Sequence, residues 1–419
     1  MNLENQIVSL AKAAKKAAFE LSLISTEKKN RALMQMAKAL SARADFLIKE
    51  NKKDLQEANQ HGYSKALIDR LSLNEKRIAD MAQCLTATAK LKDPVGEILQ
   101  TIKRPNGLLI EKVRTPIGVI GIIYESRPNV TSDCIGLCLK SGNAVILKGG
   151  KEAIHSNKAI FLVIQQALGK TKIPAGSIQL VESTDRKAVE ILLRMDKYVD
   201  VIVPRGGEEL IKFVAQHSLI PVIKHYKGVC HTYVSDQADI NMAHRICMNA
   251  KVQKPGVCNA METMLVHRNI AMRFLPVIIH DFKKFGVEIR GCPVTRKIVK
   301  QGIKKATEKD WGEEYLDLIL AVKVVDSTQA AIEHINTYGS HHSDAIVTDN
   351  KKEASQFLKS VDSACLYVNA STRFTDGYEF GFGAEIGIST DKLHARGPMA
   401  LEELTTYKFV VHGKGQIRE

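Results

Sequence analysis

Gly118-Val119-Ile120-Gly121-Ile122-Ile123 is a run of six residues in which every side chain is apolar or absent. A strand with one face in water would alternate apolar and polar residues, so this run predicts a strand buried on both faces, as in a parallel sheet. Further apolar runs of strand length occur at 144–147, 178–181, 199–203 and 221–223, with helical stretches between them. This alternation implies right-handed crossovers and a doubly wound α/β sheet.

A second alternation of apolar runs and helical stretches begins near residue 231. Its candidate strands are 231–234, 263–266, 287–289, 320–325, 344–347 and 365–368. We expect a domain boundary between the two alternations, near Lys227-Gly228. The sequence thus predicts two doubly wound α/β domains within 419 residues, a length that suits about two or three domains.

The residues that precede the first alternation, 1 to about 92, predict helices. The apolar residues within 33–40 recur at the spacing of one helix face. Ser72-Leu73-Asn74-Glu75 fits a capping box, which would start one of these helices at Ser72. This region is rich in Ala, Lys and Glu, which are good helix formers.

A small β arm is predicted outside the two alternations. Arg104-Pro105-Asn106-Gly107 lies between the apolar runs 98–102 and 108–110. Asn-Gly in that position is a strong hairpin signal, so 98–114 predicts a projecting hairpin. The apolar run 407–411 predicts one more strand. Because a lone strand needs a partner, we expect it to pair with the hairpin of a neighbouring subunit.

The composition narrows the class of ligand. Lys and Arg number 60 against 46 Asp and Glu, so the net charge is +14. This charge fits either a solvated basic surface or the attraction of an anionic ligand, such as a phosphorylated metabolite or a dinucleotide. The single Trp and the lack of a basic run interleaved with aromatics argue against a nucleic-acid partner.

The cysteines and the hydropathy pattern favour the cytoplasm. The eight cysteines form no C-x-x-C pair, and their scattered spacing suits reduced thiols better than disulfides or zinc ribbons. The first residues lack the basic and apolar regions of a signal peptide. No apolar stretch reaches the roughly 18 residues that a membrane span needs.

Two glycine-containing turns follow strands of the first alternation. Lys148-Gly149-Gly150-Lys151 follows the run 144–147, and Pro204-Arg205-Gly206-Gly207 follows the run 199–203, each with a helix after it. Backbone N–H groups at a helix start favour phosphate, and ligands of such sheets bind at this edge. Ordinary tight turns with solvated cations remain the alternative. Neither turn has the G-x-G-x-x-G spacing of a dinucleotide fingerprint, so any nucleotide site is of an unorthodox kind.

Cys258 is the cysteine whose surroundings best suit catalysis. It lies in Lys254-Pro255-Gly256-Val257-Cys258-Asn259, a loop marked by Pro-Gly between a helical stretch and the run 263–266. The alternative is a small buried hydrophobe, as most free cysteines are. The histidine-rich stretch 334–344 matches no standard metal spacing, so we expect no metal there and interpret these side chains as polar groups that line a pocket or close hydrogen bonds.

Three segments resemble a known family. The segment 325–346, VDSTQAAIEHINTYGSHHSDAI, resembles the signature segment of the gamma-glutamyl phosphate reductases, and so do 124–131, YESRPNVT, and the Cys258 loop. The resemblance extends over essentially the whole chain. It implies an aldehyde-dehydrogenase-like α/β fold, with an NADPH-binding domain (1–97 and 116–228), a catalytic domain (229–395) and an oligomerisation arm with a terminal strand (98–115 and 396–419).

The resemblance also implies roles for individual residues. Cys258 becomes the nucleophile, and Asn129 is implied to help stabilise the oxyanion. Glu314 is implied to bind the nicotinamide ribose. The remaining cofactor-binding residues that it implies are Lys148, Gly149, Arg205, Gly206 and Gly207, with Lys148 or Lys151 near the 2′-phosphate of NADPH.

The reaction that the resemblance implies is the reduction of L-glutamate 5-phosphate to glutamate 5-semialdehyde in proline biosynthesis. It further suggests a homo-oligomer, dimer or tetramer, and a functional coupling to the kinase that makes the acyl phosphate. Arg127, Arg373 and Arg396 are candidates for the substrate carboxylate, because a guanidinium can bind it in bidentate fashion.

One departure from the superfamily bears on the rival function, a hydrolytic or acylating aldehyde dehydrogenase with another substrate. Hydrolytic members carry a glutamate base in a segment that corresponds here to His225-Tyr226-Lys227-Gly228, which has none. An acyl-phosphate reductase does not need that base, since water attack on its thioester would waste the activated acyl group.

Overall fold

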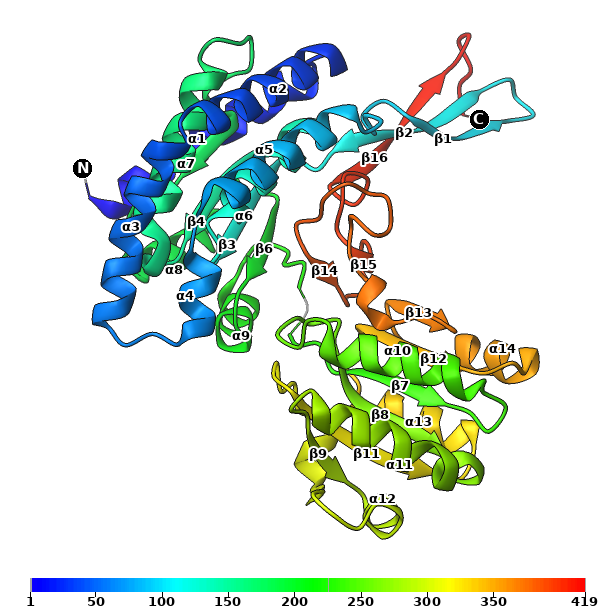
Figure 1. Ribbon diagram of the computed structural model, residues 1–419. Helices are drawn as coiled ribbons and strands as arrows, with labels where there is room; N and C mark the ends of the chain where they lie inside the picture. Colours follow the sequence, from blue (N-terminus) through cyan, green and yellow to red (C-terminus); the bar gives the residue numbers. More distant parts are fainter. Residues whose placement is uncertain (1, 225, 419) are drawn as a thin grey trace. The chain divides into compact units, whose positions relative to one another are not determined.

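The computed structural model describes residues 2–224 and 226–418, which form two compact units (Figure 1). The first unit consists of the described residues up to Lys224, together with Gly381–Gly387 and the residues from Met399 on. The second consists of the residues that follow, up to Phe380, and of Ile388–Pro398. The alternation in the sequence gives no sign that the chain returns to the first unit at residue 381.

The first unit is built on a four-stranded parallel sheet of order β5-β4-β3-β6. Its strands are β3 (Val119–Tyr124), β4 (Ala144–Gly149), β5 (Ile178–Leu180) and β6 (Val201–Arg205). Strand β3 contains Val119–Ile123 of the apolar run at 118–123, and all six of its residues are buried, as a strand covered on both faces requires. The predicted strand at 221–223 is wrong: only an isolated bridge joins Val222 to Ile202, because the run is short and Pro221 has no N–H to donate.

Helices cover this sheet; those up to Lys90 precede it in the chain, as predicted, and the others each follow one of its strands. They are α1 (Leu3–Ser22), α2 (Thr26–Ala42), α3 (Ala44–Gln60), α4 (Lys65–Leu71), α5 (Glu75–Lys90), α6 (Asn129–Lys140), α7 (Ile154–Leu168), α8 (Lys187–Leu192) and α9 (Glu208–His217), with short 3₁₀ turns η1 (Lys151–Ala153) and η2 (Ala175–Ser177). The capping box expected at Ser72 is wrong. Ser72 instead ends α4, the N–H of Leu73 donates to the side chain of Asn51, and Asn74 caps α5 by accepting from the N–H of Arg77.

The β arm of the first unit is a three-stranded antiparallel sheet. The predicted hairpin is β1 (Ile98–Lys103) and β2 (Leu109–Pro116), and the terminal strand is β16 (Thr405–His412). Strand β16 pairs with β2 of its own chain along its whole length, so the expected pairing with a neighbouring subunit is wrong. Because the chain returns to the first unit at Met399, β16 lies beside β2 of the same chain and pairs with it.

The second unit is built on a seven-stranded parallel sheet of order β10-β9-β11-β8-β7-β12-β13. Its strands are β7 (Cys230–Val234), β8 (Met261–His267), β9 (Glu288–Gly291), β10 (Lys304–Lys305), β11 (Ile319–Val325), β12 (Ser343–Val347) and β13 (Cys365–Val368). Its helices are α10 (Ile240–Val252), α11 (Arg268–Lys284), α12 (Pro293–Ile298), α13 (Thr328–Tyr338) and α14 (Lys351–Ser360), with 3₁₀ turns η3 (Glu308–Gly312) and η4 (Thr372–Phe374). Strands β14 (Ile388–Ser389) and β15 (Gly397–Pro398) form a separate antiparallel pair.

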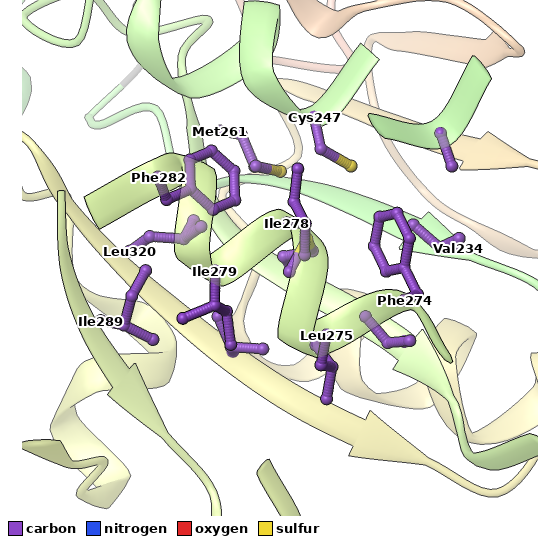
Figure 2. Close-up of a cluster of buried hydrophobic side chains, with 14 of the residues drawn as sticks. Val234, Cys247, Met261, Phe274, Leu275, Ile278, Ile279, Phe282, Ile289 and Leu320 are labelled. Atoms are coloured by element: carbon purple, nitrogen blue, oxygen red, sulfur yellow. The ribbon is translucent and has the colours of Figure 1, made fainter. Parts of the chain in front are cut away.

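The core of the second unit fixes strand β8, which begins just after Cys258. Figure 2 shows side chains of α11 packed over the sheet. Helix α11 contributes Phe274, Leu275, Ile278, Ile279 and Phe282, and the strands and α10 contribute Val234, Cys247, Met261, Ile289 and Leu320. The α11 residues recur at the spacing of one helix face, so burial of that face aligns the helix on the sheet.

In the described part of the chain, no helix combines the length and the apolar character needed to cross a bilayer.

Candidate active site

Cys258 lies in the loop between α10 and β8, and its position is set by hydrogen bonds to the main chain around it. Its carbonyl oxygen accepts a hydrogen bond from the thiol of Cys230 at 3.2 Å. The main chain of Asn259 accepts from the Thr372 hydroxyl at 2.7 Å, and the Asn259 side chain donates to the carbonyl of Thr375 at 2.9 Å. Three hydrogen bonds therefore fix the backbone at Cys258 and Asn259, next to the half-buried Cys258 side chain.

The other cysteines are poor nucleophiles by comparison. Burial raises the pKa of the thiols of Cys84, Cys134, Cys138, Cys230 and Cys247, so these groups stay protonated at neutral pH. Cys292 and Cys365 are buried. Cys258 and Cys84 are only partly buried, and Cys258 stays the nucleophile that the sequence predicts.

Gly228 packs directly against the Cys258 loop. A Cβ atom on Gly228 would lie 1.9 Å from the Cys258 carbonyl oxygen, so only glycine fits at this approach. The N–H of Gly228 donates to Oε1 of Glu314 at 2.8 Å, and the ammonium of Lys227 donates to the carbonyl of Gly312 at 2.7 Å. Gly228 therefore contacts both Cys258 and Glu314, two residues that were predicted separately from sequence. His225, in the same predicted segment, lies outside the described residues.

Glu314 also borders a cavity of about 410 Å³. Its lining includes Arg290, Asp310 and Tyr315. These three groups are joined, because Asp310 accepts from the Arg290 guanidinium at 2.7 Å and from the Tyr315 hydroxyl at 2.8 Å. Glu314 therefore lies beside a cavity whose lining includes this bonded group.

Of the three arginines proposed for the substrate carboxylate, Arg373 lies beside the cysteine loop. Its guanidinium contacts the side-chain oxygen of Asn259 and donates to Gln253 at 2.8 Å, and burial lowers its pKa. Arg396 forms an ion pair with Asp362 at 2.8 Å, so its charge is already matched. Arg127 is exposed just beyond the end of β3, in the other unit.

In the first unit, the residues after β3 and β6 lie where the order of strands reverses, the place where doubly wound sheets bind ligands. The N–H of Gly207 donates to Oε2 of Glu125 at 2.9 Å, and a Cβ on Gly206 would lie 2.2 Å from that oxygen. Burial raises the pKa of Glu125. The turn does hold an anion, but the anion is the carboxylate of Glu125 in the chain itself, a residue that was not predicted from sequence.

The other predicted turn is similarly supplied with a carboxylate. The side chain of Lys148 is buried at the end of β4 and donates to the carbonyl of Gly149 at 2.8 Å, and burial lowers the pKa of Lys148. Glu152 accepts from the N–H of Ser126 at 2.6 Å, and its carboxylate occupies the space that a Cβ on Gly150 would take.

Asn129 and Arg205 have partners within the first unit. Asn129 is the first residue of α6, and its side-chain amide donates to Asp133 at 2.8 Å. Burial raises the pKa of Asp133 to about 6, while the Asn129 bond and the charge of Arg205 act in the opposite direction. The Arg205 guanidinium packs against Gly387 of the returning segment, where a Cβ would stand 2.2 Å from Nη1.

The histidine-rich stretch closes internal hydrogen bonds. Asp344 accepts from both the main chain and the ring of His231, at 2.8 and 3.0 Å, and both side chains are fully buried. His334 contacts the Lys323 ammonium at 3.0 Å. Within residues 2–224 and 226–418, no group of three or more His, Cys, Asp or Glu side chains is arranged to hold a metal ion.

Comparison with known proteins assigns this fold and cysteine loop to a family. The family model of the aldehyde dehydrogenase family matches residues 3–296. The chain therefore belongs to the aldehyde dehydrogenase family, whose members are oxidoreductases that use nicotinamide cofactors.

Within this family, the chain has high sequence identity to the gamma-glutamyl phosphate reductases. The chain is 58% identical to a gamma-glutamyl phosphate reductase of Caldanaerobacter subterraneus, over 98% of this chain and 99% of that protein. It is 54% identical to one of Clostridium acetobutylicum, with both chains covered completely. The crystal structure of gamma-glutamyl phosphate reductase from Thermotoga maritima superposes with a TM-score of 0.96 at 48% identity, over 99% of this chain and 100% of that one. Within its family, the chain belongs to the gamma-glutamyl phosphate reductases.

Proposed function

We propose that this protein reduces L-glutamate 5-phosphate to L-glutamate 5-semialdehyde with NADPH and releases phosphate, as a step of proline biosynthesis. The observation that carries the proposal is the identity of 54–58% along the full chain to proteins named for this reaction. The lack of a glutamate at 226–228, beside the cysteine loop, agrees with a thioester that is reduced rather than hydrolysed.

Cys258 is the nucleophile in this proposal. Its thiolate attacks the acyl carbon of the substrate, the carbon–sulfur bond forms, and the bond from that carbon to the phosphate oxygen breaks, so phosphate leaves. Covalent catalysis of this kind divides one difficult step into two easier ones. The fixed backbone of Cys258 and Asn259 supports this role, because a nucleophile must stand in a defined position to attack.

The oxyanion that forms on the acyl carbon needs hydrogen-bond donors. We assign this task to the backbone N–H of Cys258 and to the side-chain amide of Asn129, whose orientation Asp133 fixes by accepting one bond. Removal of one such donor typically lowers the rate by about 10²–10³-fold. We assign the substrate carboxylate to Arg373, because it alone of the three candidate arginines borders the cysteine loop in the second unit.

NADPH would supply a hydride to the acyl carbon. The bond from that carbon to the Cys258 sulfur then breaks, so the thiolate is restored and the aldehyde is released. The residues fit an anionic dinucleotide, because the N–H of Gly207 already holds a carboxylate at the switch point of the sheet. We assign cofactor binding to Lys148, Gly149, Arg205, Gly206 and Gly207, and the nicotinamide ribose to Glu314. Glu125 must leave the Gly207 turn if a phosphate is to take its place.

We further propose a homo-oligomer that associates through the β arm. The side chains of Ile98, Tyr407, Phe409 and Val411 are 48–57% exposed on that sheet, more apolar surface than a free arm requires. The eight free cysteines suit a reducing compartment, which supports the cytoplasm as the place of action. The coupling to the kinase that makes the acyl phosphate stays a proposal from family resemblance.

The reverse reaction provides the test. The purified protein is assayed for NADP⁺ reduction with glutamate 5-semialdehyde, with and without phosphate, beside Cys258→Ala and a control, Cys84→Ala, which changes the other partly exposed cysteine. We expect turnover that requires phosphate, a loss of more than about 10³-fold in Cys258→Ala, and near-normal turnover in the control. Turnover without phosphate would instead indicate a hydrolytic dehydrogenase, and turnover that survives in Cys258→Ala would mean that another residue is the nucleophile.

A further inference from the structure

A buried ion pair closes the loop that carries Cys258. Lys251 lies in the last turn of α10, before Cys258, and Glu262 lies in β8, after it. The ammonium of Lys251 is 2.6 Å from Oε2 of Glu262, and both side chains are 0% exposed. The pair therefore joins the two ends of the cysteine loop beneath the surface.

The second oxygen of Glu262 reaches a third segment. Oε1 accepts from the N–H of Leu316 at 3.2 Å, two residues beyond Glu314. Leu316 has a φ of +52°, a left-handed conformation that leucine adopts rarely and that persists only where the surroundings enforce it. Tyr315, between the two, is held by its hydroxyl on Asp310. The loop after Glu314 is thus held on both sides in an unfavourable backbone conformation.

Stability alone does not explain this pair. Apolar residues of similar volume are often as stabilising as a buried ion pair, because the charges lose their hydration on folding. Apolar residues could not, however, connect the two ends of the cysteine loop and the Glu314 loop at once. Glu314 itself bonds to Gly228, which packs on Cys258, so the same three segments are also joined at the surface of the site.

We propose that Lys251 and Glu262 form a positioning pair, which fixes the Cys258 loop and the Glu314 loop relative to each other. The pair touches no reacting atom; it acts through Cys258 and Glu314. This inference rests on the proposed roles of those two residues, as nucleophile and as the carboxylate for the nicotinamide ribose.

Two double variants separate the two contacts of the pair. Lys251→Met with Glu262→Leu replaces the pair by apolar residues of similar volume and removes the acceptor for Leu316. Lys251→Met with Glu262→Gln also removes the ion pair but keeps an amide oxygen for the Leu316 N–H. Each is compared with the wild type in thermal unfolding, in NADPH affinity by fluorescence titration, in kcat/KM, and in the rate at which iodoacetamide alkylates Cys258, followed by mass spectrometry.

We expect the Leu variant to fold, to bind NADPH about tenfold more weakly because a partly buried hydrogen bond to Leu316 is lost, and to show an altered rate of Cys258 alkylation. The Gln variant should keep its NADPH affinity within about threefold, since its acceptor remains, while its alkylation rate changes as in the Leu variant. This separation of affinity from thiol reactivity is not expected of a pair that only stabilises the fold.

A Leu variant with wild-type NADPH affinity, kcat/KM and alkylation rate would overturn the proposal. If the Leu variant does not fold, the Gln variant decides, and an unchanged alkylation rate in it would equally overturn the proposal. If the wild type shows no turnover with glutamate 5-semialdehyde and phosphate, the proposed function fails by itself, whereas NADPH binding and alkylation still measure the positions of the two loops.

Discussion

Lys29 in the first unit and Lys251 in the second are both buried lysines whose ammonium groups contact a carboxylate. Lys29 is 2.5 Å from Asp93, and Lys251 is 2.6 Å from Glu262. The further side-chain bonds of the Lys29 pair go to the ends of helices. Lys29 donates to the carbonyl of Lys140, the last residue of α6, and Asp93 accepts from the hydroxyl of Thr26, the first residue of α2. Around Lys251, the further bond reaches the loop of a predicted functional residue.

The two ion pairs differ in the N–H group that donates to the second oxygen of the carboxylate. Asp93 uses that oxygen on the N–H of Val95, two residues along its own chain, whereas Glu262 uses it on Leu316, far along the sequence. The same chemistry therefore secures a scaffold in one unit and links two site loops in the other. Removing Lys29 should change stability without changing chemistry, and removing the Lys251 pair should change both.

Lys29→Met should have the largest effect on stability. It leaves the carboxylate of Asp93 buried, with 7% of its side chain exposed, and without its cation. Loss of one partner of a buried pair costs about 3–5 kcal/mol. Urea unfolding should show this loss, while NADPH affinity and the rate of Cys258 alkylation, measured on the folded protein, stay within about twofold. A clear change in either would mean that the two pairs do not differ in kind.

Gly228→Ala should have the next largest effect, and it acts on activity. The added Cβ would meet the Cys258 carbonyl at 1.9 Å, so the cysteine loop must shift. A displacement of about 1 Å in a reacting group can lower the rate by about 10²-fold. We expect a loss of this size in kcat/KM.

Gly312→Ala is the matched control for Gly228→Ala. A Cβ on Gly312 has only the carbonyl of Tyr338 within 4 Å, at 3.8 Å, so this variant should behave as the wild type does. Equal activity in the two glycine variants would show that the close packing of Gly228 on Cys258 does not matter for turnover.

The strands and the buried ion pairs differ in how far they could be predicted from sequence. Strand β3 and the other buried strands of both parallel sheets follow from apolar runs, because burial on both faces leaves a signal in each residue, whereas the exposed strand β10, Lys304–Lys305, has no such run and was missed. The buried ion pairs leave no such signal in the sequence. Lys251 and Glu262 are ordinary charged residues in the sequence, and only the packing of α10 against β8 brings them together and away from water.

The candidate site divides in the same way. The loop of Cys258 could be predicted, because Pro-Gly marks it in the sequence, whereas the role of the cysteine stays a prediction. Glu125 could not, since its position on the Gly207 N–H depends on β3 and β6 being neighbours, which sequence order does not show. The intrachain partner of β16 was missed for a related reason: the return of the chain at residues 381 and 399 is a property of the tertiary fold.

Substitution at Leu316 should have the smallest effect and gives the sharpest view of the Glu262 contact. Glycine adopts a φ of +52° without strain, so Leu316→Gly gains about 1 kcal/mol from relief of the left-handed conformation. It loses about 0.5–1 kcal/mol through the greater freedom of the unfolded chain, so the free energy of unfolding should barely change. Because the backbone N–H remains for Glu262, NADPH affinity should stay near that of the wild type.

Leu316→Val keeps the same N–H but is β-branched, and a β-branched residue does not tolerate this conformation. The valine variant should move the N–H away from Glu262, loosen the loop after Glu314 and weaken NADPH binding severalfold, although the exposed side chain that it replaces contributes little to the core. The pair of variants thus differs in backbone conformation more than in side-chain contacts. Equal NADPH affinity for glycine and valine would mean that the left-handed turn does not set the position of Glu314, and the contrast between the two buried lysines would then reduce to stability alone.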